Sequence, residues 1–514
     1  MKTAQRLLEY AARNGVRACF ANPGTSEMHL VAALDAVPEI RPVLCLFEGV
    51  ATGAADGYGR MTQQPALTLL HLGPGLANGL ANLHNAFRAR TPIVSLIGEH
   101  ATYHRANNPP LATDIEALAR PVSVWVQTVE RPESLVTCAA EALTAARRAG
   151  PAALILPADV AWSDVEPDLP PPTSNRRTEE ESWSNQIDQT AKALRAGAVL
   201  LLGGRLLTAK ACAAALRIAD KTGATVFVET FPARIERGVG RAPLTRIPYL
   251  TEMAVGLLSN AETIVLAGAT YPVAFFALPE RPTRLAPPGA QILQLGQPGA
   301  NPEAALEALA EALGVSAPAP FPAPALATIP NTDARLDPFG LAQVIAATLP
   351  ADAIVSDESN TLGLYAYESA ASAAPHDWLT LTGGAIGQGL PLATGAAIAC
   401  RERRVIALEA DGSALYTIQS LWTQAREGLN ATNIILNNGA YAILKLEMMR
   451  AGIAVETRAA AELFDLQRPT IDFCSVAAGF GVPAERVATV HELATALRRS
   501  YAAPGPSLIE AMFV

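Results

Sequence analysis

The sequence predicts an α/β protein of three domains, each built on a doubly wound parallel sheet. Apolar segments of strand length alternate with Ala-rich segments of helical character along most of the chain, which is typical of βαβ units. Two Pro-rich connectors, at 166–182 and 316–330, interrupt this pattern. The length of 514 residues suits three domains of roughly 150 residues each. We therefore expect domains at 1–165, 183–315 and 331–514.

Each block contains apolar runs that are short enough to be buried strands and that are separated by helical patterns. The expected strands lie at 43–47 and 66–70 in the first block, at 198–202, 225–228, 263–266 and 291–295 in the middle block, and at 379–381, 405–408 and 434–436 in the third. The first and third blocks share an order of strand, glycine-rich turn, Ala-rich helix and strand, which indicates two related domains.

Composition argues against several classes of partner. The net charge of −9 is unfavourable for binding nucleic acid or an anionic membrane. Half of the residues are hydrophobic and 17% are charged, so large apolar cores are available. Two long uncharged stretches, 66–87 and 378–400, are interrupted by polar residues, Gly and Pro, and we expect no membrane span.

The cysteines and the N-terminus point to a soluble, cytoplasmic protein. The six cysteines are scattered without a CxxC pair, which indicates buried thiols in a reducing compartment rather than disulfides or a zinc site. Met1 leads into a charged amphipathic helix and not into a signal peptide.

The most informative segment links two apolar strands of the third block. Asp411 follows the first strand, and Asn438 follows the second, 27 residues later. Because neighbouring parallel strands end at the same edge of a sheet, both side chains are expected there. A carboxylate, an amide oxygen and a nearby backbone carbonyl suit Mg²⁺, which often holds a diphosphate. The Gly412-Ser413 turn offers backbone N–H groups to the phosphates.

This segment resembles the cofactor signature of thiamine-diphosphate enzymes, which have Gly-Asp-Gly-Ser followed at this distance by Asn-Asn. Ala410 stands where the family has its first glycine, and a methyl group still fits such a turn. The resemblance implies the thiamine-diphosphate-binding fold, with pyrimidine-binding, central and diphosphate-binding domains. It also implies thiamine diphosphate and Mg²⁺ as cofactors. The metal ligands are then Asp411, Asn438 and the backbone carbonyl of Ala440, and Tyr441 lies beside the cofactor.

A second segment, from Phe47 to Arg60, is similar to the same family. Glu48 begins a helix of small residues that ends in Gly-Tyr-Gly-Arg. In the family members that act on 2-oxo acids, this glutamate contacts the pyrimidine N1′, and the helix packs on its copy in a second subunit. A carboxylate there favours the imino tautomer, whose 4′-nitrogen takes the proton from C2 of the thiazolium ring. The resemblance therefore makes Glu48 catalytic and implies a homodimer or a homotetramer.

The third segment is the glycine-rich run from Thr382 to Pro391. Its glycines let the backbone approach a ligand closely, and Pro391 suits the first turn of the next helix. In the family, an apolar side chain of this run wedges between the two rings of the cofactor. By resemblance the wedge is Ile386, and the carbonyl that faces the 4′-amino group belongs to Gly384.

Two features of the first block resemble benzoylformate decarboxylase. The run Asn-Pro-Gly before Thr25 matches its Asn-Pro-Gly-Ser, and His71 matches a catalytic histidine. Thr25 keeps the hydroxyl group, and His71 can relay protons at neutral pH. A buried histidine with a structural role is the alternative. The second histidine of that enzyme has no counterpart near Phe275, so the protonation chemistry is expected to differ.

Other features resemble acetolactate synthase. A Gly-Pro-Gly turn after His71 matches that enzyme, although Gly49 replaces a glutamine and its Asp-Ala-Phe-Gln segment is missing from 101–113. Pyruvate decarboxylase has a glutamate at the position of Leu444. An apolar residue there removes a proton donor, so the intermediate is expected to survive until it attacks a second carbonyl. We place Leu444 and His104 beside the histidine in the substrate pocket, with an exposed or structural His104 as the alternative.

The middle block offers a rival cofactor site. The strand at 198–202 is followed by Gly203-Gly204-Arg205 and a helix, as in a dinucleotide fold. The block lacks the full Gly-x-Gly-x-x-Gly spacing and an acidic residue at the expected strand end. We therefore expect neither a nicotinamide nor a flavin (FAD) there.

We expect an enzyme that decarboxylates a 2-oxo acid and transfers the acyl-carbanion equivalent to a carbonyl acceptor, as acetolactate synthase does. Its partners are expected to be a small-molecule 2-oxo acid and a second copy of the chain, since Glu48 and Asp411 must meet across an interface. Three alternatives stay open. They are a simple decarboxylase of the benzoylformate type, an oxalyl-CoA decarboxylase or 2-hydroxyacyl-CoA lyase, and a non-catalytic protein, against which the presence of Glu48, Asp411 and Asn438 argues.

Overall fold

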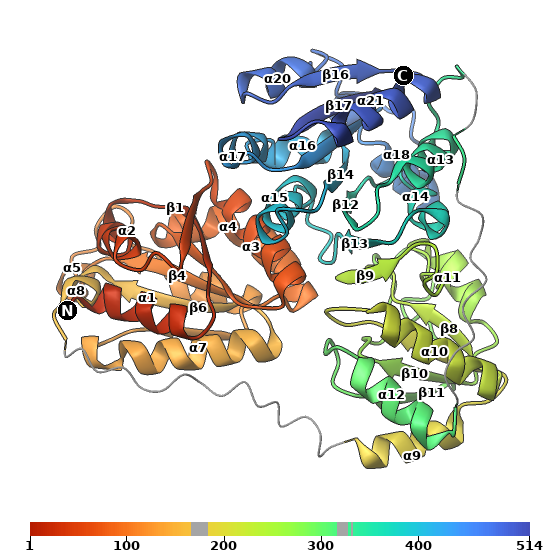
Figure 1. Ribbon diagram of the computed structural model, residues 1–514, viewed down its shortest axis with the longest axis horizontal. Coiled ribbons are helices and arrows are strands. Elements are labelled where there is room, and N and C mark those ends of the chain that lie inside the picture. The colour runs from red at the N-terminus through yellow and green to blue at the C-terminus, as the bar shows by residue number, and fades with distance from the viewer. Residues whose placement is uncertain (166–182, 316–326, 330–332, 514) are drawn as a thin grey trace.

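The computed structural model describes residues 1–165, 183–315, 327–329 and 333–513. They form three α/β units, each around its own sheet, coloured red to orange, yellow to green, and cyan to blue in Figure 1. The prediction of three parallel-sheet domains is confirmed. Both predicted connectors lie outside the described residues except for 327–329, and the predicted domain boundaries stay a proposal.

The first sheet has six parallel strands in the order β2-β1-β3-β4-β6-β5. The strands are β1 (Ala18–Asn22), β2 (Arg41–Leu44), β3 (Ala66–Leu70), β4 (Ile93–Glu99), β5 (Trp125–Thr128) and β6 (Ala152–Pro157). The helices are α1 (Thr3–Arg13), α2 (Met28–Asp35), α3 (Glu48–Thr62), α4 (Leu72–Ala89), α5 (Thr102–Arg105), α6 (Ile115–Ala119), α7 (Leu135–Ala149) and α8 (Ala158–Trp162), with a 3₁₀ turn at Thr25–Glu27. Strands β3, β4 and β6 are buried along their whole length, as expected for apolar parallel strands. The strand predicted at 43–47 corresponds to β2, which ends at Leu44, three residues before the predicted end. The chain leaves the sheet there and enters α3 at Glu48.

The middle sheet has four parallel strands in the order β11-β10-β7-β8. They are β7 (Ala198–Leu202), β8 (Thr225–Val228), β10 (Thr263–Ala267) and β11 (Gln291–Leu295), and all four were predicted. The helices are α9 (Ser184–Ala193), α10 (Ala209–Thr222), α11 (Thr251–Leu258) and α12 (Glu303–Ala312).

The third sheet has seven strands in the order β16-β17-β15-β14-β12-β13-β9. The strands are β9 (Arg234–Arg237), β12 (Ala353–Glu358), β13 (His376–Thr380), β14 (Val405–Ala410), β15 (Ala431–Asn437), β16 (Ala484–Val487) and β17 (Ser507–Met512). The helices are α13 (Pro338–Thr348), α14 (Ala366–Ser369), α15 (Gly389–Ala399), α16 (Asp411–Thr417), α17 (Ser420–Glu427), α18 (Ala442–Arg450), α19 (Arg458–Phe464), α20 (Phe473–Gly479) and α21 (Val490–Ala502). The first and third units therefore both place helices after parallel strands, as their shared sequence pattern predicted.

Strand β9 (Arg234–Arg237) was absent from the expected set. It belongs in sequence to the middle block but pairs antiparallel with β13 at the edge of the third sheet. Arg234 donates to Asp377 at 2.8 Å, and the guanidinium of Arg237 lies 3.4 Å from the centre of the Tyr367 ring. A strand with two arginines and one glutamate in four residues lacks the apolar pattern that predicts strands.

Helix α3 packs closely against α15, and glycines make the contact possible. A Cβ atom on Gly57 would lie 2.0 Å from the carbonyl oxygen of Leu392, and one on Gly395 would lie 1.8 Å from that of Ala54. The prediction that small residues let α3 approach a partner closely is confirmed. Within the chain, the partner on this face is α15, and packing of α3 on its copy in a second subunit stays a prediction.

A buried ion pair on α3 joins all three units. Arg60 donates to the two carboxylate oxygens of Asp56 at 2.9 and 2.7 Å, and both side chains are almost fully buried. The remaining N–H groups of Arg60 donate to the carbonyl oxygens of Ala233 and Thr380 and to the Thr382 hydroxyl. All five guanidinium N–H groups are therefore satisfied, which offsets the cost of burying the charges.

Two further expectations can be compared with the fold. In the part of the chain that the structure describes, no helix has both the length and the apolar character that a bilayer span requires. All six cysteines are free thiols.

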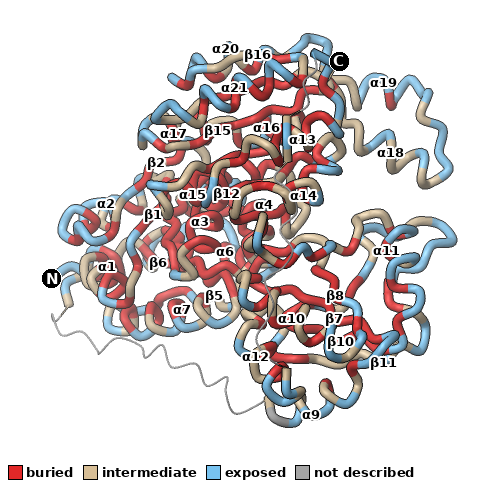
Figure 2. Tube along the Cα trace, turned by 45° about the vertical axis from the view of Figure 1, so that its right-hand side comes forward, coloured by how far each residue is buried: buried red, intermediate tan, exposed pale blue. Residues whose placement is uncertain are grey.

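Figure 2 shows α18 and α19 standing apart from the buried core, and Ala460 is the one buried residue in these two helices.

Replacing Arg60 tests the role of its ion pair. Arg60→Leu leaves Asp56 buried without its cation, and breaking a buried pair in this way costs about 3–5 kcal/mol. We therefore expect a clear fall in melting temperature by calorimetry. The control is Arg120→Leu, which removes an exposed pair with Glu116 and should change stability by about 0.5 kcal/mol or less. Equal melting temperatures for the two variants would contradict the role of Arg60.

Candidate active site

The carboxyl edge of the first sheet presents Glu48 and His71. Glu48 is the first residue of α3 and is buried, and its Oε2 accepts a hydrogen bond from the Asn78 amide at 3.0 Å. A Cβ atom on Gly75 would lie 3.3 Å from the other Glu48 oxygen and 3.3 Å from the His71 Cβ. Both predicted catalytic side chains therefore border the same glycine in the first turn of α4.

His71 is held by a glutamate that was missing from the predicted site. The imidazole Nδ1 lies 2.9 Å from Oε2 of Glu27, which is almost fully buried. The same oxygen accepts the N–H of Gly24 at 2.8 Å, and the Ser26 hydroxyl donates to Oε1 at 2.5 Å. A carboxylate that accepts from every neighbour leaves Nδ1 of His71 as a donor. Glu27 thereby fixes the orientation of the ring.

Thr25, predicted as a catalytic hydroxyl, lies one residue from this contact. Its side chain is exposed, and the Ser26 hydroxyl lies 3.0 Å from the imidazole instead. Asn22 at the end of β1 is opposite Leu70 at the end of β3. The turn that follows β1 therefore lies close to His71, which follows Leu70. The catalytic role of Thr25 stays a prediction.

The carboxyl edge of the third sheet brings Asp411 and Asn438 together, because β14 and β15 are neighbours. Asp411 Oδ1 accepts the N–H of Gly412 at 2.8 Å. Its Oδ2 accepts the N–H groups of Asn438 and Gly439 at 3.1 and 2.7 Å. The carboxylate therefore organises the turns after both strands.

The donor atoms at this edge fit Mg²⁺. Burial raises the pKa of Asp411, and the backbone N–H groups that point at its carboxylate oppose this effect. The side-chain oxygen of Asn438 accepts the N–H of Ala440 at 3.0 Å, which orients the amide. One carboxylate, one amide oxygen and the Ala440 carbonyl are the hard oxygen donors that this cation prefers. A cation here would also reduce the cost of keeping Asp411 ionised.

Tyr441 and Ser413 border the same turn. A Cβ atom on Gly412 would lie 2.4 Å from the Tyr441 ring, so only glycine fits beneath it. The Ser413 hydroxyl oxygen accepts a hydrogen bond from the Asn360 amide at 3.1 Å. Ser413 therefore lies in the first turn of α16, and the Tyr441 ring lies against the same turn at Gly412.

The glycine-rich run between β13 and α15 lies against both the first and the middle units. Gly384 has a left-handed backbone (φ +73°), and a Cβ atom there would lie 2.3 Å from the Phe275 ring. Asn85 of α4 bonds to both backbone groups of Ala385, at 2.8 and 3.1 Å. Ile386, the predicted wedge, directly follows this anchored residue. Its place and that of Gly384 are thus set by contacts with two other units.

The predicted pocket residues Leu444 and His104 lie outside these contacts. Leu444 is in the first turn of α18, is 41% exposed, and follows Tyr441 by three residues. His104 is exposed on α5, and its ring centre is 5.6 Å from that of His100. Their roles in the pocket stay predictions.

The prediction that the middle block lacks an acidic residue at a strand end is wrong, because Glu229 directly follows β8. This glutamate contacts the glycine turn of the rival dinucleotide site. Gly204 donates its N–H to Glu229 Oε1 at 3.0 Å, so a phosphate at this turn would meet a carboxylate. Desolvation raises the pKa of Glu229 to about 7. A cavity of about 610 Å³ beside it is lined by Arg90, Tyr249 and Phe275 among others.

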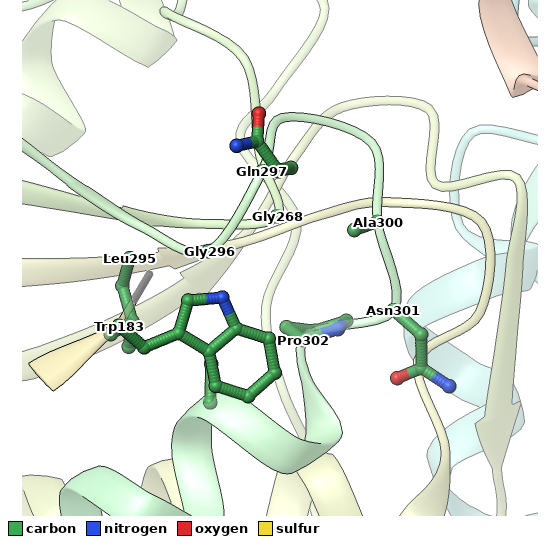
Figure 3. A pocket seen from close by; sticks show the side chains of 9 residues that line it. Trp183, Gly268, Leu295, Gly296, Gln297, Ala300, Asn301 and Pro302 are labelled. Atoms are coloured by element: carbon green, nitrogen blue, oxygen red, sulfur yellow. The ribbon is translucent and has the colours of Figure 1, made fainter. Parts of the chain in front are cut away.

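A second hollow in the middle unit is too small for a cofactor. Figure 3 shows the Trp183 indole beside Pro302, with Gln297 and Asn301 as the neighbouring polar side chains. Its volume of about 10 Å³ is room for roughly one water molecule.

A stripe of asparagines on α4 was also missing from the predicted site. Asn78, Asn82 and Asn85 are spaced four and three residues apart and therefore share one face of the helix. Asn82 donates to the carbonyl oxygens of Gly49 and Gly387, at 2.8 and 3.1 Å, and so connects the Glu48 helix to the glycine-rich run. The spacing of three amides by four and three residues within one predicted helix was the signal that could have found them.

Comparisons with known proteins agree with this geometry. The profile of the thiamine pyrophosphate enzyme N-terminal TPP binding domain matches residues 1–118, and that of the C-terminal TPP binding domain matches residues 361–511. IlvX of Mycobacterium tuberculosis, whose provisional name is acetolactate synthase large subunit, is 48% identical over 99% of this chain and 98% of its own. Benzoylformate decarboxylase of Pseudomonas aeruginosa is 30% identical over 98% of this chain and 97% of its own.

A solved structure shares all three units. The thiamine diphosphate-dependent 4-hydroxybenzoylformate decarboxylase of Rhodococcus jostii RHA1 superposes with a TM-score of 0.86 at 26% identity, over 99% of this chain and 98% of that one. The resemblance carried by the Glu48 and Asp411 segments is confirmed. The chain belongs to the thiamine pyrophosphate (thiamine diphosphate) enzyme family.

Proposed function

We propose that this protein removes CO₂ from a 2-oxo acid and joins the remaining acyl group to a carbonyl acceptor, using thiamine diphosphate and Mg²⁺. The names of its relatives, acetolactate synthase and benzoylformate decarboxylase, support a 2-oxo acid as the substrate. The observation that carries the proposal is the meeting of Asp411, Asn438 and Ala440 at the ends of two neighbouring parallel strands.

The third unit would hold the diphosphate end of the cofactor. Asp411, Asn438 and the Ala440 carbonyl would bind Mg²⁺ and, through it, the phosphates. Bound thiamine diphosphate supplies a carbon nucleophile at C2 of its thiazolium ring. Ile386 would separate the two rings, and the Gly384 carbonyl would accept a hydrogen bond from the 4′-amino group.

Glu48 would act at the pyrimidine end. Asn78 holds one of its oxygens, which leaves the other, beside Gly75, to share a proton with N1′. Shielding from water strengthens this hydrogen bond and keeps the proton at the cofactor.

His71 would relay protons on the substrate side. Because Nδ1 donates to Glu27, Nε2 of the neutral ring is the atom that takes a proton. Glu27 would stabilise the charged imidazolium that results, so the pair is built to gain and return a proton in each cycle.

The fate of the acyl group distinguishes two candidate reactions. In both, the bond between carbonyl and carboxylate carbons breaks, CO₂ leaves, and the electron pair stays on the former carbonyl carbon. Leu444, which offers no proton, favours attack of that carbon on a second carbonyl, giving a 2-hydroxy ketone. The Glu27–His71 pair favours the second candidate, simple decarboxylation, in which a proton arrives and an aldehyde leaves.

We also propose that the active unit is a dimer or a dimer of dimers. Several large apolar side chains of the diphosphate-binding unit are exposed in the single chain, and a partner subunit would cover them. They include Leu364, Tyr365, Leu415 and Tyr416. Leu415 and Tyr416 belong to α16, which begins at Asp411, so a partner that covers them would lie beside the proposed metal site.

Removal of both cofactors tests the proposed function. Protein dialysed against EDTA at mildly alkaline pH should no longer decarboxylate pyruvate, 2-oxobutyrate, benzoylformate or oxalyl-CoA, whichever of them it accepts beforehand. Chelation removes the cation that connects Asp411 and Asn438 to the diphosphate. Activity, measured with product identification by chromatography, should return only when thiamine diphosphate and Mg²⁺ are both added. Full recovery without added metal would contradict the roles of Asp411 and Asn438.

The variant Glu48→Gln tests the acid at N1′. It should stay folded and lower the rate of proton exchange at C2 of bound thiamine diphosphate by about 10²–10⁴-fold, measured by NMR, because it removes the acidic proton. The control is Glu99→Gln, an equally buried carboxyl at the end of β4 that accepts the His100 N–H. Wild-type exchange in Glu48→Gln would rule out the assignment.

The variant Leu444→Glu tests the fate of the acyl group. A carboxylic acid at this position could donate the proton that ends the reaction, so the ratio of aldehyde to 2-hydroxy ketone should rise. Leu463→Glu, on the exposed face of α19, is the control and should leave the ratio unchanged. Product ratios at matched turnover decide the matter. If they are the same in all three proteins, Leu444 is not near the reacting carbon.

A further inference from the structure

Glu358 is a buried carboxylate to which the reaction above gives no role. It is the last residue of β12, is 2% exposed, and is the register partner of Glu409 on β14. Burial raises the pKa of Glu358 to about 7, although backbone N–H groups of the glycine-rich run oppose this rise. Both glutamates lie at the carboxyl edge of the third sheet. Glu409 precedes the proposed ligand Asp411 by two residues.

Both oxygens of Glu358 bind the glycine-rich run. Oε1 accepts the N–H of Gly387 at 2.7 Å, and Oε2 accepts the N–H of Gly389 at 2.5 Å. One carboxylate thus holds the backbone on both sides of Gln388. Only a group with two acceptor oxygens can make both bonds, since an amide would turn an NH₂ donor toward one of the N–H groups.

The rest of the run is anchored on the other side of the predicted wedge. Asn85 bonds to both backbone groups of Ala385. The carbonyl oxygen of Gly387 accepts from Asn82 at 3.1 Å and from Thr417 at 2.9 Å. Ile386 lies between these two anchored residues, so its backbone position follows from theirs. Release of Gly387 and Gly389 would remove the anchor on the C-terminal side of Ile386.

The second carboxyl makes this arrangement costly. A Cβ atom on Gly389 would lie 2.0 Å from Glu409 Oε2 and 3.0 Å from the Glu358 Cβ, so the run packs directly on both acids. Within the described residues, neither Glu409 oxygen makes a hydrogen bond of standard geometry, and its neighbours are the second acid, Glu358, and the backbone of Leu390. Stability alone would favour apolar side chains at such buried positions. The cost indicates that the contact between Glu358 and the run serves a purpose beyond folding.

We propose that Glu358 is a positioning residue for the proposed reaction, holding Gly387 and Gly389 so that Ile386 and the Gly384 carbonyl stay in place for the cofactor. It acts through the backbone of the run and touches neither cofactor nor substrate. This role rests on the proposed function, and it adds to it the element that sets the geometry of the wedge.

The first test needs no cofactor. Amide hydrogen exchange of the cofactor-free protein, followed by mass spectrometry, should be at least about tenfold faster in the 383–389 segment of Glu358→Gln than in wild type. Asp357→Asn is the matched control. Asp357 precedes Glu358 on the same strand but bonds to Ser359 and Trp378, so its removal should leave exchange in that segment unchanged. Equal exchange in Glu358→Gln and wild type would overturn the proposal.

The second test is a double-mutant cycle with the wedge. Glu358→Gln and Ile386→Ala should each slow proton exchange at C2 of bound thiamine diphosphate by about 10–100-fold, as small misplacements near a reacting centre do. If Glu358 acts through Ile386, the double variant should be within about threefold of the slower single variant. Rates that multiply would overturn the proposal.

The two ideas can fail separately. If the wild-type protein does not bind thiamine diphosphate, the proposed function fails, and the amide-exchange test still decides whether Glu358 holds the run. If the wild type exchanges its C2 proton but Glu358→Gln does so equally fast, the positioning role fails and the proposed function stands.

Discussion

The buried Asp56–Arg60 ion pair is the interaction on which the arrangement of the site depends. Arg60 reaches from α3 to the middle and third units, while Asp56 also accepts from the Thr91 hydroxyl at 2.5 Å and from the Gln388 amide at 2.6 Å. Gln388 belongs to the glycine-rich run. A single charged pair therefore fixes the position of the Glu48 helix relative to that run. Because the pair is buried, this arrangement depends on the folding of the whole chain.

The close packing of α3 against α15 also fixes the position of the Glu48 helix relative to the glycine-rich run. Gly57 and Gly395 bring the two helices to a distance at which a methyl group would meet a backbone oxygen. Because Glu48 begins one helix and the run with Ile386 precedes the other, a close and rigid contact sets the catalytic acid relative to the wedge. Asn82 and Asn85 on α4 add hydrogen bonds to the Glu48 helix and to the glycine-rich run. Three carboxylates then fix local positions: Glu27, in the turn after β1, orients His71, Asp411 organises the turns after β14 and β15, and Glu358, at the end of β12, holds the run.

Much of this followed from the sequence because its signals are local. Buried parallel strands read as continuous apolar runs, and an acid directly after such a run marks the ligand edge of a sheet, which is how Asp411 was found. Glu358 ends β12 in the same way, but its partners are backbone groups about 30 residues further on and carry no side-chain signature. Strand β9 was missed because Ile235 is its one apolar residue, and the ion pair of Arg234 and the ring contact of Arg237 that help to hold it leave no apolar pattern. The sequence did not indicate that Ser26, next to Thr25, has its hydroxyl beside His71, because this contact depends on the geometry of the turn after β1.

The central claim is that Glu48 and the Asp411–Asn438 turns bind opposite ends of one molecule. A crystal structure of the protein grown with thiamine diphosphate and Mg²⁺ tests this claim most directly. We expect density for the metal within about 2.0–2.1 Å of an Asp411 oxygen, the Asn438 side-chain oxygen and the Ala440 carbonyl. We expect the pyrimidine N1′ of the same cofactor molecule at hydrogen-bond distance from a Glu48 carboxyl, contributed by this chain or by a second copy. A cofactor that binds elsewhere, or a pyrimidine ring that no Glu48 touches, would contradict the account.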